Sequence, residues 1–60
     1  MPDTYVEEAM FRGAQVTVFT TNGYQLRGII THDDLEYIVL LSNGKKKMIY
    51  KHAISTIEPA

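Results

Sequence analysis

Near the start of the chain, apolar residues recur at the spacing of one helix face, at positions occupied by Tyr5, Val6, Ala9 and Met10. Asp3 is of a residue type that caps helix N-termini, and Arg12 followed by Gly13 is typical of a helix end. We therefore predict a helix over about residues 3–12. So short a helix is not stable alone, and its apolar stripe must pack against another element.

From Gln15 onward, apolar and polar positions alternate with a period of two and β-branched residues dominate, which predicts strands. The pairs Asn22-Gly23 and Asn43-Gly44 are strong hairpin signals. The predicted strands cover about residues 15–21, 24–32, 37–41, 46–50 and 54–57, and the last one ends before Pro59. Gly28 stands inside the second strand and indicates a bulge or a sharp bend there.

A short helix followed by five antiparallel strands defines a mainly β fold class. Strongly bent strands in so short a chain predict one small, partly open barrel over residues 1–60, of the SH3-like or OB-like kind, and the leading helix favours the SH3-like variant. The apolar strands at residues 48–50 and 54–57 fall at the end of the sheet, where an uncovered edge invites aggregation. Pairing between identical chains removes such edges, and a head-to-tail contact of this kind closes into a ring when the rotation between subunits permits.

The composition also favours self-association. Sixty residues with 45% apolar positions form a marginal core, and the absence of cysteine excludes disulfides, iron–sulfur clusters and cysteine-based zinc sites. No apolar run has the ~20 residues of a membrane span and the N-terminus lacks the features of a signal peptide, so we expect a soluble, cytoplasmic protein without membrane contact. No spacing of His and carboxylate residues suits a metal, and no cofactor is expected.

The net charge of −1 gives no reason by itself to expect a polyanionic partner. Its distribution is uneven, because four of the six basic residues lie in one short segment, as Lys45, Lys46, Lys47 and Lys51. Charge alone equally allows a solubilising turn. An enzyme is the least favoured class, since Ser55 and Thr56 have no neighbouring base and the glycines form no phosphate-binding loop.

Two segments are specific enough to suggest a family. Residues 50–56, Tyr-Lys-His-Ala-Ile-Ser-Thr, resemble the second Sm signature of the bacterial Hfq family, and residues 16–19 with 22–28 resemble its first. The predicted helix stands where that family has its short N-terminal helix, so the resemblance covers nearly the whole chain. It implies an Sm fold assembled into a hexameric ring through the fourth and fifth strands of neighbours. It also implies an RNA chaperone that promotes the pairing of small regulatory RNAs with messenger RNAs.

The resemblance implies a site for U-rich RNA on the proximal face, around the pore of the ring, formed by Lys51, His52 and Tyr37. There the lysine contacts phosphate or base oxygens, the histidine bonds the sugar-phosphate, and the aromatic ring stacks on a base. The residues alone equally allow Lys51 and His52 to be a polar loop between two strands. The sequence departs from the family pattern at Pro2, where the family has Gln, and at Asp33, where it has an aromatic residue.

A second implied site is the distal face, which binds A-rich single strands. Val16 and Val18 supply the inward side of the first strand, so Phe19 points the other way and suits base stacking. The alternative is that at least one of the two aromatic residues of this hairpin, Phe19 and Tyr24, belongs to the core. The expected distal residues are Phe19, Asn22, Gly23, Tyr24, Gln25, Leu26, Arg27 and Lys47.

The resemblance also implies an outer rim late in the helix, where the family often has a basic pair. This chain has Met10 and Phe11 there, followed by Arg12, so we expect weak annealing of RNA strands at the rim. Single-stranded RNA, as small regulatory RNA or messenger RNA, and further copies of the chain are the expected partners. The alternative from another class is a monomeric SH3-like module that binds a protein or peptide, because a fold does not fix a function.

Overall fold

One helix and five strands follow one another along the chain in the computed structural model, which describes residues 3–60 without the side chain of Asp3. The elements are α1 (Asp3–Arg12), β1 (Gln15–Thr20), β2 (Gln25–Asp33), β3 (Tyr37–Ser42), β4 (Lys45–Tyr50), the 3-10 turn η1 (Lys51–Ala53) and β5 (Ile54–Pro59). The predicted fold class is confirmed. The capping role expected of Asp3 and the departure noted at Pro2 concern side chains outside those described.

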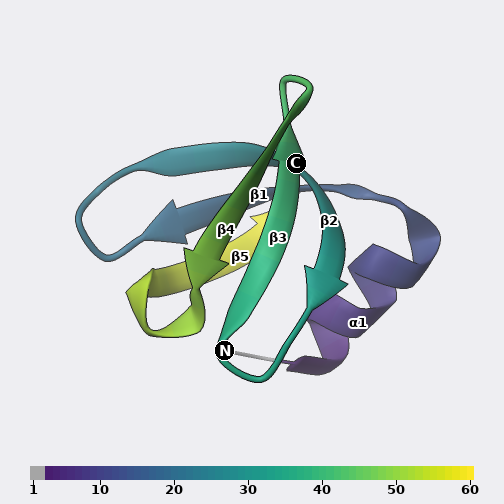
Figure 1. The fold of residues 1–60 in the computed structure, drawn as a ribbon, viewed down its shortest axis with the longest axis horizontal. Helices are drawn as coiled ribbons and strands as arrows, with labels where there is room; N and C mark the ends of the chain where they lie inside the picture. Colours follow the sequence, from purple (N-terminus) through teal and green to yellow (C-terminus); the bar gives the residue numbers. More distant parts are fainter. Residues whose placement is uncertain (1–2) are drawn as a thin grey trace.

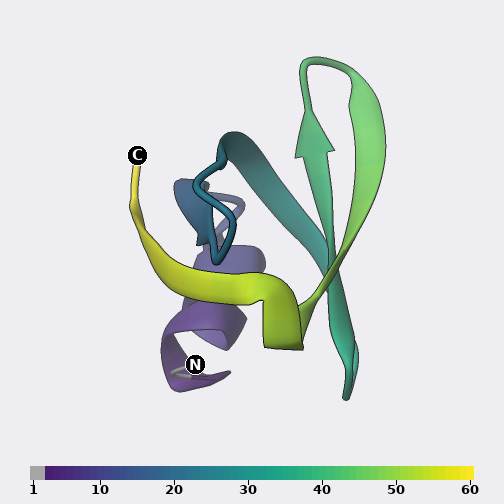
Figure 2. The same cartoon turned by 90° about the vertical axis from the view of Figure 1, so that its left-hand side faces the viewer.

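The five strands form one antiparallel sheet in the order β4-β3-β2-β1-β5. Strand β2 lies at its centre and bends: its first half runs beside β1 and its second half turns to run beside β3 (Figure 1). Seen from the side, the β3–β4 hairpin stands at one end of the molecule, while α1, β1 and β5 lie at the other (Figure 2). The bend therefore divides the sheet into two parts joined by β2.

Gly28 lies at this bend. A Cβ atom there would collide with the backbone carbonyl of Leu41 on β3, so only glycine allows the two strands to approach so closely. The expected bulge is not at Gly28, because the pairing of β1 with β2 continues unbroken through it. The irregular registers lie instead between Ile30 and His32 on β2, and between Phe19 and Thr20 on β1. The sharp bend is confirmed, and the bulge is displaced along the strand.

Both predicted hairpin signals form turns. Asn43 and Gly44 have φ angles of 52° and 77° between the paired residues Ser42 and Lys45, which is the two-residue turn that asparagine and glycine favour. Gly23 also has a positive φ, of 94°, and its N–H donates to the carbonyl oxygen of Thr20 at 3.1 Å. The sequence of each turn thus fixes how its two strands meet.

Nine apolar side chains form the core beneath α1 and inside the bend: Val6, Ala9, Val16, Val18, Ile30, Ile38, Leu40, Ile49 and Ile57. The helical stripe is confirmed, because Val6 and Ala9 are buried and Tyr5 and Met10 pack against the same cluster. A core of this size in so small a chain is marginal by itself. Additional apolar contacts between copies of the chain would therefore add substantially to its stability.

All strand ends but that of β5 lie within one residue of the prediction. Strand β5 does not stop before Pro59, which pairs with Val16 of β1. Proline is tolerated because β5 pairs on one side only, so the missing N–H costs no ladder bond there. Strand β2 starts and ends one residue later than expected, at Gln25 and Asp33, so the next turn begins at Asp34. This small shift places Asp33 on the sheet instead of in the turn.

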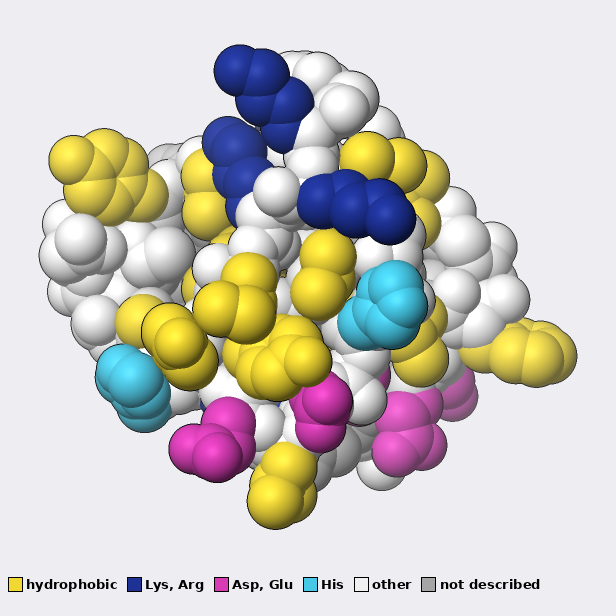
Figure 3. Space-filling view, viewed as in Figure 1, with side chains coloured by type: hydrophobic (Ala, Val, Ile, Leu, Met, Phe, Trp, Pro, Cys, Tyr) yellow, Lys and Arg dark blue, Asp and Glu magenta, His cyan; other side chains and the backbone are white. Residues whose placement is uncertain are grey.

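One face of the molecule gathers exposed apolar side chains over β3 and β4, with Lys and Arg at the hairpin end and Asp and Glu at the opposite end (Figure 3). The apolar residues include Leu41, Met48 and Tyr50, and the exposed Leu35 precedes them in the turn before β3. Strands β4 and β5 are the two edges of the sheet, each paired on one side. In the described part of the chain, no helix has the length and apolar character needed to cross a membrane.

Candidate functional site

A groove of about 390 Å³ lies between the start of β2 and the β3–β4 hairpin. Its lining includes four residues of the expected distal set, Gln25, Leu26, Arg27 and Lys47. Gln15, Ser42 and Asn43 add further polar groups to the lining. The structure thus brings Lys47 to the β2 residues, although twenty positions separate it from Arg27 in the chain. We refer to this feature as the hairpin groove.

The hairpin groove combines two cationic side chains with polar groups and has no carboxylate in its lining. Arg27 offers a planar fork of N–H donors and Lys47 a mobile ammonium group, and both suit phosphate oxygens or the acceptor edges of bases. The amides of Gln25 and Asn43 add donors and acceptors that can pair with a base edge. A single-stranded polyanion fits this chemistry well.

The aromatic residues of the first hairpin lie beside the groove and not in its lining. Tyr24 is 66% exposed at the start of the strand that leads into the groove. Phe19 is half-buried and pairs with Gln25 on one side and Thr56 on the other, both of which are exposed. The outward direction expected of Phe19 is confirmed. A half-buried ring and an exposed ring next to a cationic groove provide surfaces on which bases can stack.

The turn between these aromatics is held by its own polar side chains. The Thr20 hydroxyl donates to Asn22 Oδ1 at 2.6 Å, and the backbone N–H of Tyr24 donates to Thr20 Oγ1 at 3.0 Å. Asn22 therefore orders the turn through its side-chain oxygen. Gly23 supplies the positive φ that the turn needs.

Leu26 has a different position from that expected for a surface residue. It pairs with Val18 and packs against the core, while Arg27 on the opposite face of β2 pairs with Thr17. The alternation of a strand makes this unavoidable, because neighbouring side chains point to opposite faces. Leu26 also contributes to the lining of the hairpin groove.

The three expected proximal residues lie at the other end of the β3–β4 hairpin, and we refer to Tyr37, Lys51 and His52 as the η1 site. Tyr37 pairs with Tyr50 across β3 and β4, and the His52 ring stacks on Tyr50 with ring centres 5.5 Å apart and planes 13° apart. The backbone N–H of Lys51 donates to the Glu36 carbonyl oxygen at 2.8 Å. This bond ties η1 to the turn before β3 and so brings the three residues together.

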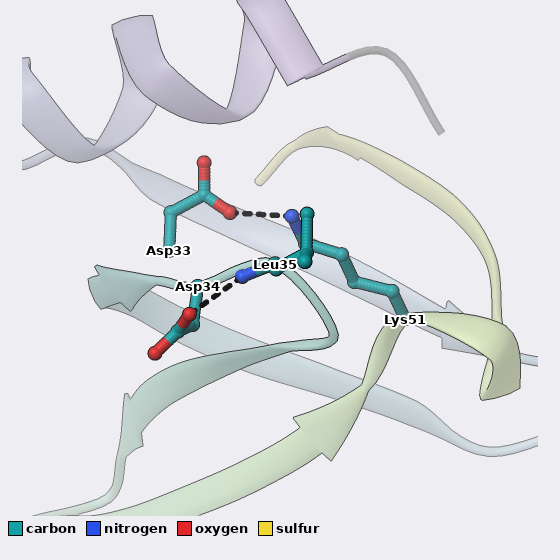
Figure 4. Close-up of polar contacts among 4 residues, drawn as sticks. All are labelled: Asp33, Asp34, Leu35 and Lys51. Carbon is teal, nitrogen blue, oxygen red and sulfur yellow. Dashed lines mark hydrogen bonds and ion pairs between the residues drawn. The ribbon is translucent and has the colours of Figure 1, made fainter.

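Lys51 reaches back to a carboxylate of its own chain. Its Nζ lies 2.8 Å from Asp33 Oδ1, and the two side chains are only 19% and 10% exposed (Figure 4). Asp33 Oδ1 is buried and accepts no hydrogen bond of good geometry, so the ammonium charge is what compensates it. No local sequence pattern indicates this ion pair, because eighteen positions separate the two residues. It follows from the extension of β2 to Asp33.

Asp34 links Lys51 to Tyr37. Its carboxylate accepts a hydrogen bond from the Leu35 N–H at 2.7 Å (Figure 4), and this bond, with the Tyr37 side chain and then the Lys51 charge, lowers the pKa of Asp34. The interaction with Asp34 raises the pKa of Tyr37. The turn therefore holds an ionised carboxylate beside a neutral phenol at the η1 site.

Tyr37 also borders a second hollow of about 390 Å³ on the outer face of β3 and β4, together with Leu35, Met48 and Tyr50. At the helix end, Arg12 and Phe11 are exposed, Phe11 by 92%, whereas Met10 packs against the core. One of the two rim positions is thus used for folding. The other presents a single aromatic ring next to one arginine.

The chain has a short helix before a bent five-stranded sheet, a close contact at Gly28 and two edge strands that are each paired on one side. Together these features define the Sm-like class of small β proteins. Solved structures agree with this class. The structure is similar to a heptameric archaeal Sm protein, with a TM-score of 0.75 over 95% of this chain and 97% of that one, at 18% identity. At this identity the likeness concerns the fold alone.

Sequence comparison narrows the class. The family model described as Hfq protein matches residues 1–60. An RNA-binding protein Hfq of Clostridium botulinum (strain Hall) is 45% identical over 60 residues, which cover all of this chain and 71% of the relative, and one of Alkaliphilus oremlandii is 42% identical over 98% of this chain and 74% of the relative. A crystal structure of the pleiotropic translational regulator Hfq matches with a TM-score of 0.89 and 43% identity over 93% of both chains. The chain belongs to the Hfq family.

Proposed function

We propose that this chain forms a ring of six identical subunits that binds single-stranded RNA. The hairpin groove carries the assignment, because it joins Arg27 and Lys47, two donors for phosphates and base edges, with no opposing carboxylate in its lining. The relatives in the same family are named RNA-binding proteins. Six such grooves around a ring would bind successive segments of one strand, which multiplies the affinity of a single groove.

Ring assembly is supported by the two edges of the sheet. Strands β4 and β5 each have one side without a strand partner in the chain, and exposed apolar residues lie on β4 beside its edge. Pairing β4 of one subunit with β5 of the next would satisfy both edges and bury Met48 and Tyr50 at least in part. The whole chain then acts as one Sm-like unit of the ring.

The proposed role is post-transcriptional: the ring holds small regulatory RNAs and messenger RNAs and favours their pairing. A-rich strands would use the hairpin groove with Tyr24 and Phe19, and U-rich strands the η1 site. We propose no catalytic activity and no cofactor for the chain, and a location in the cytoplasm, where both kinds of RNA occur in a bacterium. A monomeric SH3-like module that binds peptides is not favoured, given the family to which the chain belongs.

One sample tests both parts of the proposal. Light scattering gives the mass in solution, for which we expect about six times the 6.8 kDa of one chain. Fluorescence anisotropy with A-rich and U-rich oligoribonucleotides gives the affinities, with oligodeoxyribonucleotides and a duplex as controls. A monomer, or a ring that binds single strands no better than duplex, would contradict the proposal.

A further inference from the structure

The two RNA sites have opposite charge environments. Arg27 and Lys47 share the hairpin groove with no carboxylate in its lining, whereas Lys51 at the η1 site lies against Asp33 at 2.8 Å. Asp34 is close enough to Lys51 for the lysine charge to lower the pKa of that carboxyl. Two carboxylates thus face one ammonium group. The local charge at the η1 site is therefore not positive, and its balance does not favour an incoming phosphate.

The Asp33–Lys51 pair is also difficult to open. With exposures of 10% and 19%, the two side chains have lost most of their water, and Asp33 Oδ1 has no hydrogen bond of good geometry to replace the ammonium. If Lys51 turned to an RNA phosphate, it would leave a buried carboxylate without compensation, which is costly. A phosphate must therefore compete with a carboxylate that is already in place and fixed by the sheet.

A neutral acceptor meets a different situation. A base carbonyl, such as those of uracil, brings no net charge into the repulsion of the carboxylates, whereas a backbone phosphate brings a full negative charge. The carboxylates beside Lys51 therefore disfavour contact with the backbone phosphates more than contact with a base edge.

We propose that Asp33 is a specificity-determining residue of the ring: by holding Lys51, it lowers the affinity of the η1 site for U-rich RNA and makes that binding only weakly dependent on salt. The inference rests on the proposed function, since it assumes that the ring binds RNA at both sites. The proposal assigns the lower affinity to one ion pair and not to the overall negative charge of the site. A matched carboxylate that does not hold the lysine as a direct partner should matter less.

The test compares two variants that make the same change of charge at neighbouring positions. Asp33→Asn removes the carboxylate that pairs with Lys51, and Asp34→Asn removes an exposed carboxylate whose main contacts are to Leu35 and Tyr37. Anisotropy with oligo-U and with an A-rich strand is measured at several salt concentrations, and light scattering checks the ring. We expect Asp33→Asn to tighten oligo-U binding about tenfold, equivalent to about 1.4 kcal/mol, with a steeper salt dependence. Asp34→Asn should change it much less, and A-rich binding should stay the same in both variants.

Several results would overturn the inference. Equal increases in oligo-U affinity in the two variants would mean that the net charge of the site, and not the ion pair, sets the affinity. An unchanged oligo-U affinity in Asp33→Asn would exclude a role of the ion pair. If Asp33→Asn does not fold, the salt dependence of binding to the unmodified ring tests the inference instead. A salt dependence as steep for oligo-U as for the A-rich strand would contradict the role of Asp33 in holding Lys51. Loss of binding to both strands in the unmodified ring would instead refute the proposed function, so the two failures are distinguishable.

Discussion

The hydroxyl of Ser42 donates a 2.7 Å hydrogen bond to the backbone carbonyl oxygen of Arg27. Ser42 is the last residue of β3 and is 4% exposed, while Arg27 precedes the bend of β2 at Gly28. Beyond Leu41 and Ile29 no β2–β3 ladder pair continues, so this side-chain bond joins the strands where the backbone ladder stops. It therefore holds the wall of the hairpin groove that carries Arg27.

We expect Ser42→Ala to destabilise the folded chain by about 1–2 kcal/mol, the cost of leaving a part-buried carbonyl without its donor. The measurement is urea unfolding followed by circular dichroism at fixed protein concentration. Ser42→Cys separates the hydrogen bond from packing, because it keeps the shape but is a weak donor. A Cys variant as stable as the original would show that the bond contributes little. The Ala variant should also bind A-rich RNA less tightly.

The close approach of β2 and β3 gives a second prediction. Gly28→Ala would drive a methyl group into the Leu41 carbonyl, and backbone cannot move aside cheaply, so we expect a loss of at least about 3 kcal/mol and no ring. Gly44→Ala is the matched control. Gly44 has a positive φ of 77° but open space around it, so its cost should be about 1 kcal/mol. Similar losses in the two variants, measured by thermal unfolding, would contradict a special role for Gly28.

If folding and ring assembly are coupled, stability must depend on concentration. The core is small, and each edge strand has one side without a partner strand in the described chain. The midpoint of thermal unfolding should therefore rise steadily when the protein concentration increases from micromolar to hundreds of micromolar. Differential scanning calorimetry measures this directly, with light scattering to follow the mass. A midpoint independent of concentration together with a monomeric mass would exclude an obligate ring.

Most of the fold is predictable from local chemistry. The helix bounds, both asparagine-glycine turns and the inward positions of Val16 and Val18 follow from spacing and residue type, which act over a few residues. The end of β5 at Pro59 does not, because proline is acceptable only where its missing N–H is not needed for the pairing with β1. That condition depends on the order of strands in the sheet, which no short segment contains.

The sites show the same limit. Resemblance and residue type predict the lysine-histidine pair and the hairpin aromatics. The ion pair of Asp33 with Lys51 and the proximity of Lys47 to Arg27 depend instead on how distant strands pair. Leu26 is expected among the distal residues; strand alternation turns it toward the core, and it also lines the hairpin groove. The period of two predicts this orientation from the sequence.

The turn before β3 predicts a pH effect on stability. The Leu35 N–H first, and then Tyr37 and the Lys51 charge, lower the pKa of Asp34 from its ordinary 3.8, so the folded state favours the ionised form. The stabilisation is present above pH 3.8 and is lost as the pH falls through the lowered pKa. Asp34→Asn should therefore flatten the acid side of the thermal midpoint plotted against pH, between about pH 2 and pH 5. If the thermal midpoint of the variant fell with decreasing pH as steeply as that of the original chain, the turn would not stabilise the ionised form of Asp34.

We finally expect the ring to bind A-rich RNA more tightly than U-rich RNA. The hairpin groove offers Arg27 and Lys47 without a carboxylate, and Tyr24 is 66% exposed beside it, whereas Lys51 at the η1 site is held by a carboxylate. Tyr24→Ala should cost about 1–3 kcal/mol against an A-rich strand, through the loss of one stacked base per subunit, with little effect on oligo-U or on the ring mass. Phe11→Ala is the matched control, because it removes an even more exposed aromatic ring from the helix, and it should leave the affinity for A-rich RNA unchanged. If oligo-U bound as tightly as the A-rich strand at the same salt concentration, or if Tyr24→Ala weakened both equally, the hairpin groove would not be the stronger site.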